Sequence, residues 1–307
     1  MSASDHPEGQ KAHVLCGRTL AKKVTERIGE GVAEVIRQSG GTVVPQLVAV
    51  QVGADPASSR YIRMKERAAG EVGMLFQAKR FDKDISVSVL LQEIHALNAD
   101  PGVHGVIVQL PLPAHIPERV AADAVAHAKD VDGLHISNVG ALARGDPPLF
   151  LPCTPKGVML MLDSVRQLDP SFDLRGKSAV VVGRSNIVGK PVAQLLLQRD
   201  CTTRICHSRT VNIQEELQTA DIVVVAVGRP HFLQADWVKP GAVVIDVGIN
   251  SIEDAALPSG ERLVGDVHPD VAFKAFAVSP VPGGVGPMTV AMLLQNTLEA
   301  AQRQSNL

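Results

Sequence analysis

Residues Ser178 to Pro191 read S-A-V-V-V-G-R-S-N-I-V-G-K-P, and the apolar stretch A-Q-L-L-L follows shortly after. The run from Ser178 to Val182 is short, apolar and β-branched, which is typical of a buried strand. Gly183 then begins a turn, and Gly189 starts a stretch that predicts a helix to about Arg199. Strand, glycine turn and helix can form a dinucleotide site, because glycine lets the backbone approach a pyrophosphate and the helix N-terminus presents free N–H groups. The spacing G-x-S-x-x-x-G differs from the usual G-x-G-x-x-G, so tight packing of the turn explains these glycines equally well at this point.

The composition is that of an ordinary globular protein. The chain has 307 residues and a formal net charge of -2, and its length predicts about two domains. The small net charge and the few aromatic residues predict neither nucleic acid nor a charged membrane surface as a partner. The apolar runs are too short for a membrane span. The polar start, residues 1–12, lacks the apolar core of a secretory signal and is expected to be a flexible tail of a cytoplasmic protein.

The cysteines are scattered and follow no metal-ligand spacing, so no metal site is predicted. Reduced thiols are expected. The four cysteines are Cys16, Cys153, Cys201 and Cys206.

Apolar periodicity predicts alternating strands and helices, separated by a Gly- and Pro-rich connection at residues 140–155. This alternation favours parallel sheets with helices on their outer faces. Before the connection, the predicted helices are 20–36, 58–72, 87–98 and 117–128, and the predicted strands are 46–52, 74–81 and 103–110. After it, the predicted helices are 157–168, 189–199 and 287–301, and the predicted strands are 178–182, 203–206, 222–227, 242–247 and 275–279.

Tyr61 and Lys65 lie four residues apart in the predicted helix 58–72, so they share one helical face. A lysine that is partly removed from water can have a pKa nearer neutrality, which allows it to move protons. An ordinary solvated helix face is the alternative, since Arg63 and Glu66 lie in the same stretch.

Gln109 and an acidic pair follow apolar runs and are expected in loops. The Gln109 amide could hold a lysine or a polar group of a substrate, or it could satisfy local backbone groups. Asp130 and Asp132 alternate, so in an extended segment they face the same way. A carboxylate there can accept paired hydrogen bonds from an amino-pyrimidine ring, although two acids before a glycine also form ordinary turns. The spacing of a calcium loop is absent.

The predicted strand 203–206 leads into H-S-R-T, and this loop bears on the choice of cofactor. Sites for NAD use an acidic residue here to hold the ribose hydroxyls, and this sequence has none. The hydroxyl of Ser208 and the guanidinium of Arg209 suit a 2′-phosphate, and Arg184 adds a second cation. The loop therefore favours NADP over NAD, with an ordinary polar loop as the alternative.

Nine stretches together resemble the bifunctional methylenetetrahydrofolate dehydrogenase/cyclohydrolase (FolD) family. They occur in the family's order and span about Val14 to Ala301, which makes the resemblance specific. They are V-G-A-D-P-A-S-S-R-Y-I-R-M-K from Val52, V-Q-L-P-L-P from Val108, K-D-V-D-G from Lys129, P-C-T-P-K-G from Pro152, G-R-S-N-I-V-G-K-P from Gly183, C-H-S-R-T from Cys206, A-D-I-V-V-V-A-V-G-R-P from Ala220, V-I-D-V-G-I-N from Val244 and P-V-P-G-G-V-G-P-M-T from Pro280.

The resemblance implies two successive reactions on tetrahydrofolate. NADP⁺ takes a hydride from 5,10-methylene-tetrahydrofolate, and water then opens the methenyl cation to 10-formyl-tetrahydrofolate. By the same resemblance Lys65 is the acid/base of the hydrolytic step, and Gln109 hydrogen-bonds it. Tyr61 would stack near the folate, and Asp132 would anchor the pterin ring. The remaining implied contacts are Pro282, Gly283 and Gly284 for folate, and Gly183, Arg184, Ser185, Ser208, Arg209 and Ile249 for NADP.

The resemblance also implies an α/β fold class with two three-layer domains. The second would be a Rossmann-type NADP-binding domain, and the C-terminal helix would pack back on the first. We expect a folate-binding catalytic domain at residues 13–155 plus 287–303, and an NADP-binding domain at residues 156–286. The site is expected between them, and a homodimer is expected through the NADP-binding domain.

Three places depart from the family's usual pattern, and none replaces a residue assigned to chemistry. They are Cys16, Ile136-Ser137 and His268-Pro269. Two other functions stay open at this point. One is a dehydrogenase without cyclohydrolase activity, and the other is a nucleotide- or folate-binding module without turnover. A lysine with a glutamine partner argues against both, because neither needs a proton-transfer pair.

Overall fold

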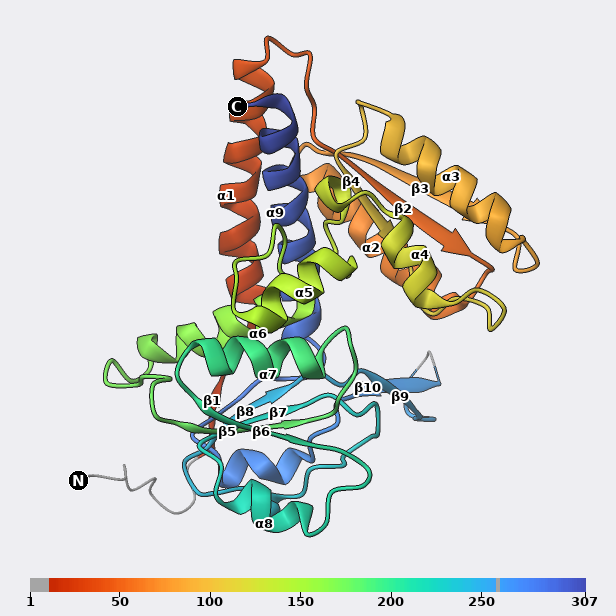
Figure 1. Cartoon of the computed structure of the whole chain (residues 1–307). Coiled ribbons are helices and arrows are strands. Elements are labelled where there is room, and N and C mark those ends of the chain that lie inside the picture. Colours follow the sequence, from red (N-terminus) through yellow and green to blue (C-terminus); the bar gives the residue numbers. More distant parts are fainter. Residues whose placement is uncertain (1–10, 258–259) are drawn as a thin grey trace. The chain divides into compact units, whose positions relative to one another are not determined.

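A computed structural model describes residues 11–257 and 260–307 (Figure 1). Nearly all of the predicted tail lies outside the described residues. The chain forms two compact units. The three-stranded unit comprises Ala21–Cys153 and Val290–Leu307, and the six-stranded unit comprises the described residues up to Leu20 together with Thr154–Thr289.

The three-stranded unit is a parallel sheet in the order β3-β2-β4. Its central strand is buried on both faces, which explains why its sequence is apolar with little alternation. Val48 and Val50 pack against Leu90 and Ile94 of α3, and α2 packs on the sheet as well. The strands are β2 (Gln46–Val52), β3 (Leu75–Phe81) and β4 (Gly105–Val108), and the helices are α1 (Gly17–Gln38), α2 (Pro56–Glu71), α3 (Val87–Ala99), α4 (Glu118–Ala124) and α5 (Ile136–Arg144).

The last helix, α9 (Val285–Ser305), returns to this unit. It runs beside α1 (Figure 1), and Gly31 of α1 faces Leu298 so closely that an added Cβ would lie 2.6 Å from Leu298 Cδ2. Asn296 Nδ2 donates to the carbonyl oxygens of Val131 (2.8 Å) and Leu151 (3.0 Å). The predicted return of the C-terminal helix is confirmed.

The six-stranded unit is a parallel sheet in the order β1-β11-β8-β7-β5-β6. The chain leaves β5 for β6 on one side and then crosses back to β7 on the other, so the strand order reverses between β5 and β7. In Figure 1, α7 and α8 lie on opposite sides of this sheet. The strands are β1 (His13–Val14), β5 (Ser178–Val182), β6 (Thr202–Cys206), β7 (Ile222–Val225), β8 (Val243–Asp246) and β11 (Ala277–Val278), and the helices are α6 (Cys153–Asp163), α7 (Gly189–Gln198) and α8 (Ile213–Gln218).

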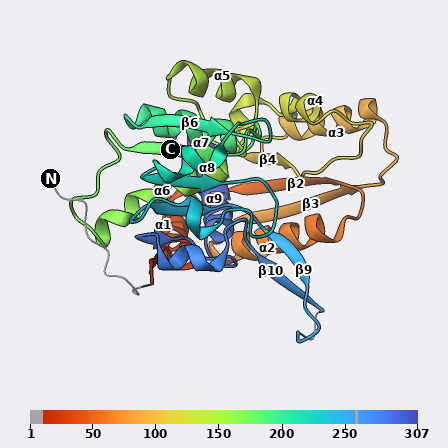
Figure 2. The same cartoon turned by 90° about the horizontal axis from the view of Figure 1, so that it is seen from below.

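Two features of the six-stranded unit were not predicted from the sequence. The strand β1 pairs with β11, so residues 13–20 group with this unit rather than with the predicted domain 13–155. An antiparallel hairpin of β9 (Asn250–Glu253) and β10 (Glu261–Val264) projects from it (Figure 2). Both β1 and the hairpin strands are short, and two to four residues carry too little periodicity to be recognised.

The predicted connection at residues 140–155 was wrong in part, because α5 extends into it and α6 begins at Cys153. The predicted helix 117–128 is also shorter, since α4 ends at Ala124. A side-chain cap starts α5, since the His135 ring nitrogen Nδ1 accepts a hydrogen bond from Ser137 N (3.1 Å).

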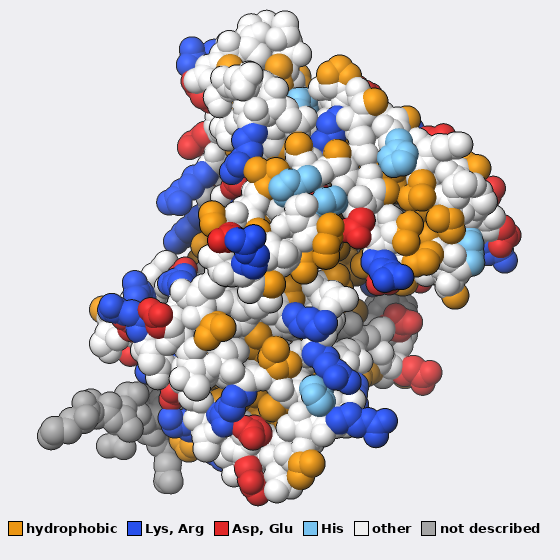
Figure 3. All heavy atoms as spheres, viewed as in Figure 1, with side chains coloured by type: hydrophobic (Ala, Val, Ile, Leu, Met, Phe, Trp, Pro, Cys, Tyr) orange, Lys and Arg blue, Asp and Glu red, His pale blue; other side chains and the backbone are white. Residues whose placement is uncertain are grey.

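Acidic and basic side chains are both present on the face shown in Figure 3, in keeping with the small net charge. Within the described part of the chain, none of the helices combines the length and the apolar character that crossing a bilayer requires.

Candidate functional site

The Lys65 amine and the Gln109 amide meet as the sequence predicted. Lys65 lies on α2, and Gln109 follows the last residue of β4. Lys65 Nζ donates to Gln109 Oε1 at 2.9 Å, while Gln109 Nε2 donates to the carbonyl oxygen of Leu110 at 2.7 Å. This second bond fixes the orientation of the amide, so that its oxygen faces the lysine.

The N-terminus of α2 is fixed against the same loop. Asp55 caps the helix by accepting a hydrogen bond from Ser58 N (2.7 Å), and Pro56 suits the first helical position. The Ser58 hydroxyl is buried and donates to the carbonyl oxygen of Leu110 at 3.4 Å. The helix that carries Lys65 and the loop that carries Gln109 are therefore joined at one backbone carbonyl.

Asp132 and Cys153 complete the surroundings of Lys65. Desolvation lowers the pKa of Lys65, and the charges of Asp132 and Cys153 oppose this shift. Burial raises the pKa of Asp132, while the charge of Lys65 and a hydrogen bond from Cys153 favour its ionised form. A lowered pKa for the amine and a raised pKa for the carboxyl bring the two groups closer in acidity, which favours proton exchange between them.

Cys153 was not among the predicted site residues. It forms no disulfide, its thiol is buried, and the thiol donates to the carbonyl oxygen of Val131 at 3.3 Å. The only sequence signal for its place was the family-like stretch P-C-T-P-K-G.

Asp130 has a different role from Asp132, because the residues after Asp130 form a turn and not the extended segment in which the two would face the same way. Asp130 is buried and accepts hydrogen bonds from Leu134 N (3.2 Å), His135 N (2.8 Å) and Asn138 Nδ2 (2.7 Å). It therefore anchors the start of α5. Burial raises its pKa to about 6 in spite of these bonds.

Tyr61 lies one helical turn before Lys65 and is half-buried. Desolvation raises the pKa of its phenol, so the hydroxyl stays neutral at physiological pH. Its ring provides a flat apolar surface beside the amine, which suits stacking against a planar ring system.

In the six-stranded unit, the glycine turn after β5 has a close backbone approach that requires glycine. Gly183 has φ +126°, and a Cβ there would lie 2.3 Å from the carbonyl oxygen of Ala226, the residue after β7. A Cβ on Gly189 would lie 2.2 Å from the carbonyl oxygen of Gly183. The turn therefore lies at the carboxyl ends of β5 and β7, where the strand order reverses and open α/β sheets bind ligands.

The side chains of this turn are available to a ligand. Arg184 and Ser185 are exposed. The Ser185 hydroxyl oxygen accepts hydrogen bonds from Val188 N (3.1 Å) and Gly189 N (3.3 Å), which shapes the entry into α7. The N-terminus of this helix favours a phosphate.

The loop after β6 lies beside this turn, because β5 and β6 are neighbours and Gly183 N donates to the carbonyl oxygen of Cys206 at 2.9 Å. His207 N donates to the Thr210 hydroxyl at 2.9 Å and Arg209 N to His207 Nδ1 at 3.1 Å, so the loop is held by its own residues. Ser208 and Arg209 project into solvent at its tip.

The other residues predicted to contact ligands also lie in the six-stranded unit. Ile249 is exposed after β8, and its Cδ1 would lie 3.5 Å from a Cβ on Gly286. The segment with Pro282, Gly283 and Gly284 precedes α9 and is held by Arg18 N, which donates to the carbonyl oxygen of Gly283 at 2.9 Å.

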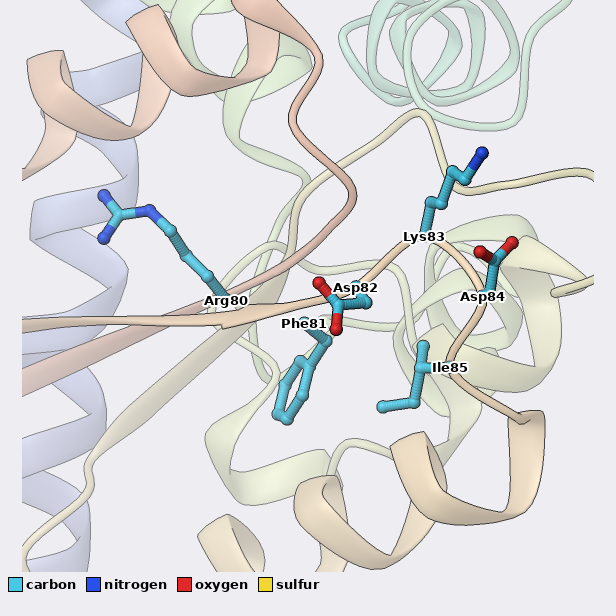
Figure 4. Close-up of a pocket in the computed structure, with 6 residues that line it drawn as sticks. All are labelled: Arg80, Phe81, Asp82, Lys83, Asp84 and Ile85. Carbon is cyan, nitrogen blue, oxygen red and sulfur yellow. The ribbon is translucent and has the colours of Figure 1, made fainter.

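Two cavities lie away from these residues. One, of about 620 Å³, is formed by the consecutive residues Arg80–Ile85 at the end of β3 and in the loop after it (Figure 4). In Figure 4, Arg80 and Lys83 point in different directions, so their charges do not converge on one point. The other, of about 420 Å³, lies beside the β9–β10 hairpin. Among the described residues, no group of three or more His, Cys, Asp or Glu side chains is arranged to hold a metal ion.

Comparison with known proteins identifies the family. The family profile described as "Tetrahydrofolate dehydrogenase/cyclohydrolase, catalytic domain" matches residues 15–132, and the one described as "Tetrahydrofolate dehydrogenase/cyclohydrolase, NAD(P)-binding domain" matches residues 152–305. The chain belongs to the tetrahydrofolate dehydrogenase/cyclohydrolase family. The resemblance seen in the sequence is thereby confirmed.

Relatives in this family match over nearly the whole chain. "Bifunctional protein FolD 1/3" of Ruegeria pomeroyi is 50% identical over 96% of this chain and 97% of its own length. "Bifunctional protein FolD" of Moorella thermoacetica is 50% identical over 95% of this chain and 99% of its own length. The Trypanosoma brucei dehydrogenase-cyclohydrolase (FolD), solved in complex with NADP cofactor and inhibitor, has a TM-score of 0.90 and 38% identity, covering 97% of this chain and 99% of that one.

Proposed function

We propose that this protein is a bifunctional enzyme of folate one-carbon chemistry. It oxidises 5,10-methylene-tetrahydrofolate to the methenyl cation with NADP⁺ and then hydrolyses that cation to 10-formyl-tetrahydrofolate. Membership of the family and relatives named as bifunctional over nearly the full chain support both reactions.

The observation that carries the proposal is the 2.9 Å hydrogen bond from Lys65 Nζ to Gln109 Oε1, with Asp132 as the neighbouring charge. A binding module would not need an amine with a lowered pKa held by a neutral amide. A dehydrogenase alone would not need such an amine either, because water is not a reactant in hydride transfer.

Lys65 performs the proton transfers of the hydrolysis. The methenyl carbon is already electrophilic, so the attacking water needs only a base. The neutral Lys65 amine takes a proton as the new C–O bond forms. The resulting ammonium returns a proton to the leaving ring nitrogen as the C–N bond breaks, and the hydroxyl proton goes to solvent as the formyl group forms. Gln109 holds the amine in place, and its neutrality leaves the amine able to lose its proton.

The folate would be held from several sides. Asp132 accepts paired hydrogen bonds from the amino-pyrimidine edge of the pterin, and Tyr61 stacks near it. We include Pro282, Gly283 and Gly284 among the folate contacts on the strength of the family resemblance.

The six-stranded unit fits NADP. A Cβ on Gly183 or Gly189 would clash with a neighbouring carbonyl oxygen, so glycine at both positions allows the tight turn that leads into α7. The N-terminus of that helix suits a pyrophosphate. Ser185 contributes its hydroxyl there, and Ile249 contributes backbone contacts. Two exposed guanidinium groups, of Arg184 and Arg209, and the exposed hydroxyl of Ser208 suit a 2′-phosphate. When bound, NADP⁺ supplies the hydride acceptor.

One spectrophotometric time course tests the function, because the methenyl compound absorbs differently from both its precursor and its product. The purified protein is mixed with 5,10-methylene-tetrahydrofolate and NADP⁺. NADP-dependent appearance and decay of the methenyl signal is expected. Lasting accumulation would indicate a dehydrogenase alone, and absence of the signal would indicate a binding module.

We further propose that the protein is a cytoplasmic homodimer associated through the NADP-binding part of the chain, as the family resemblance implies. Light scattering should give a mass of about twice the 32.5 kDa of one chain. A mass of one chain at micromolar concentration would exclude the dimer.

A further inference from the structure

The carboxylate of Asp266 is enclosed by four hydrogen-bond donors. It is fully buried just after β10. It accepts from three successive backbone groups, Val227 N (2.7 Å), Gly228 N (2.9 Å) and Arg229 N (2.8 Å), and from Asn250 Nδ2 (2.9 Å).

Successive backbone N–H groups that point at one centre form an anion-binding concavity. Here the protein's own carboxylate fills it, so the loop at residues 227–229 is held in one conformation without a bound ligand. Charge-assisted hydrogen bonds to a buried carboxylate are stronger than those to a neutral acceptor. The loop is therefore held more firmly than its glycine content would suggest.

This loop lies at the crevice where the cofactor is expected. It directly follows Ala226, whose carbonyl oxygen is in close approach to Gly183 of the glycine turn. The loop and the turn are the connections after β7 and β5, the two strands where the order of the sheet reverses. Residues 227–229 thus form one wall of that crevice.

The backbone at Asp266 is held from β8, and its carboxylate is held from the hairpin. Asp246, at the end of β8, accepts hydrogen bonds from Asp266 N (3.0 Å) and Val267 N (2.9 Å). Asn250 is the first residue of β9. The hairpin and the loop after β7 are consequently joined at a single carboxylate.

We propose that Asp266 is a positioning residue for the nicotinamide cofactor, acting by holding the backbone of residues 227–229 in the shape that receives it. This inference rests on the proposed NADP-dependent activity. Asp266 contacts neither reaction's reacting atoms, and Asn250 supports it from the hairpin.

The test compares Asp266→Asn with the unchanged protein in both activities. The asparagine side chain has one acceptor oxygen in place of two, so it can accept only some of the hydrogen bonds that the carboxylate accepts. Its NH₂ group would face hydrogen-bond donors of the backbone. We expect KM for NADP⁺ to rise by roughly tenfold or more, with a smaller fall in kcat. Hydrolysis of added methenyl-tetrahydrofolate should stay within about twofold, because Lys65 and Gln109 belong to the other unit.

Asn250→Ala removes only the support from the hairpin and should raise KM for NADP⁺ by a few-fold. Asp254→Ala is the matched control: it removes another hairpin carboxylate, which pairs with Arg262 Nε at 2.6 Å, and should leave KM for NADP⁺ unchanged. If Asp266→Asn does not fold, KM for NADP⁺ in Asn250→Ala is the measurement that tests the inference.

A wild-type KM for NADP⁺ in folded Asp266→Asn, or in Asn250→Ala where only that variant folds, would overturn the inference. Equal losses of both activities in folded Asp266→Asn would also overturn it, since they indicate a general structural role. Failure of the proposed function would be seen separately, as an unchanged protein that produces no methenyl signal with NADP⁺.

Discussion

The Lys65 amine is paired with an amide rather than with a carboxylate, and this determines what it can do. A direct carboxylate partner would stabilise the ammonium and keep the proton on it. Gln109 accepts a hydrogen bond without adding charge, so desolvation can lower the pKa of Lys65. Asp132 limits that shift, which leaves the amine able both to take and to return a proton.

Replacing Lys65 with Met should abolish hydrolysis and preserve the fold. Loss of a proton-transfer group costs on the order of 10²- to 10⁴-fold in rate, measured as decay of added methenyl-tetrahydrofolate. Arg63→Met is the matched control, since it removes an exposed cation from the same helix. Hydrolysis at the wild-type rate in Lys65→Met would remove this lysine from the mechanism.

Arg184→Ala should weaken NADP binding far more than NAD binding. A guanidinium that contacts a 2′-phosphate contributes a charge-assisted bond worth about 1.5–3 kcal/mol, or roughly 10- to 100-fold in affinity for NADP alone. Dissociation constants for both cofactors can be measured by titration. Arg175→Ala, which removes an exposed cation paired with Asp173 (2.6 Å), should change neither. Equal losses for both cofactors would contradict a 2′-phosphate role for Arg184.

Residue patterns predicted the Lys65–Gln109 pair only as one of two alternatives, and the family resemblance decided between them. Alternation would place Asp130 and Asp132 on one side only in an extended segment. Residues 131–132 instead form a turn, which was the alternative, and Asp130 is buried against the start of α5. Such a division between two nearby carboxylates depends on tertiary burial, which local spacing does not contain.

At the scale of elements, α5 depends on the buried Asp130. This carboxyl has a folded-state pKa of about 6, above its ordinary value of 3.8. A raised folded-state pKa means that the folded protein binds the proton more tightly. Asp130 therefore contributes stability that is fully present below about pH 4 and is lost as the pH rises to about 6.

Asp130→Asn should lower the free energy of unfolding by about 1–3 kcal/mol at pH 7, because one of the two acceptor oxygens becomes an NH₂ group that faces hydrogen-bond donors. The difference between the two proteins should grow as the pH falls from about 6 to about 4, since only the unchanged protein gains a proton-linked contribution. Denaturant titrations at several pH values measure it. A difference that shrinks toward acid would contradict the raised pKa. As a control, Asp146→Asn removes the exposed partner of Arg144 and should cost less than about 1 kcal/mol.

The packing of α1 on α9 can be tested with two glycines of one helix. Gly29 has open space around an added Cβ, whose nearest neighbour would be 3.9 Å away, whereas a Cβ on Gly31 would lie 2.6 Å from Leu298 Cδ2. Gly29→Ala should stabilise the fold by about 0.5–1 kcal/mol, because alanine favours a helix. Gly31→Ala should stabilise it less or destabilise it, since crowding costs about 1–3 kcal/mol.

Thermal unfolding of both variants provides the comparison. In a Leu298→Ala background the crowding is gone, so Gly31→Ala and Gly29→Ala should then have similar effects. An equal gain in thermal stability from Gly29→Ala and Gly31→Ala in the otherwise unchanged protein would mean that α9 does not crowd α1 at Gly31.

Long amphipathic helices and buried strands could be predicted from the sequence, because each carries enough residues for its period to be visible. The helix predicted at 20–36 is α1, and the strand predicted at 46–52 is β2 with the same bounds. The two-residue strand β1 could not be predicted, because only its distant partner β11 defines it. The four-residue strands of the hairpin are too short for their period to be visible. The capped helix α5 was hidden by the Gly- and Pro-rich composition around it.

At the scale of the whole molecule, the residues proposed for the two reactions belong to different units. Lys65, Gln109 and Asp132 lie in the three-stranded unit, and Gly183 and Arg184 lie in the six-stranded unit. A substitution of Lys65, which acts in the hydrolysis, or of Arg184, which acts on the cofactor, should therefore spare the other activity, since effects at sites without shared contacts are largely independent. Asp132 differs from these two, because it anchors the folate that both reactions use.

A mixing experiment tests this independence. Lys65→Met should produce methenyl-tetrahydrofolate and release it, while Arg184→Ala should still hydrolyse methenyl-tetrahydrofolate supplied from solution. Lys65→Met alone, with 5,10-methylene-tetrahydrofolate and NADP⁺, should accumulate the methenyl compound. Adding an equal amount of Arg184→Ala should convert the methenyl compound to 10-formyl-tetrahydrofolate after a lag, because the intermediate must diffuse from one protein to the other.

The double variant Lys65→Met/Arg184→Ala, added in place of Arg184→Ala, is the control and should leave the methenyl signal in place. Persistence of the methenyl signal in the mixture, above its slow decay in buffer, would mean that Arg184 also supports hydrolysis and that the two sets of residues do not work independently.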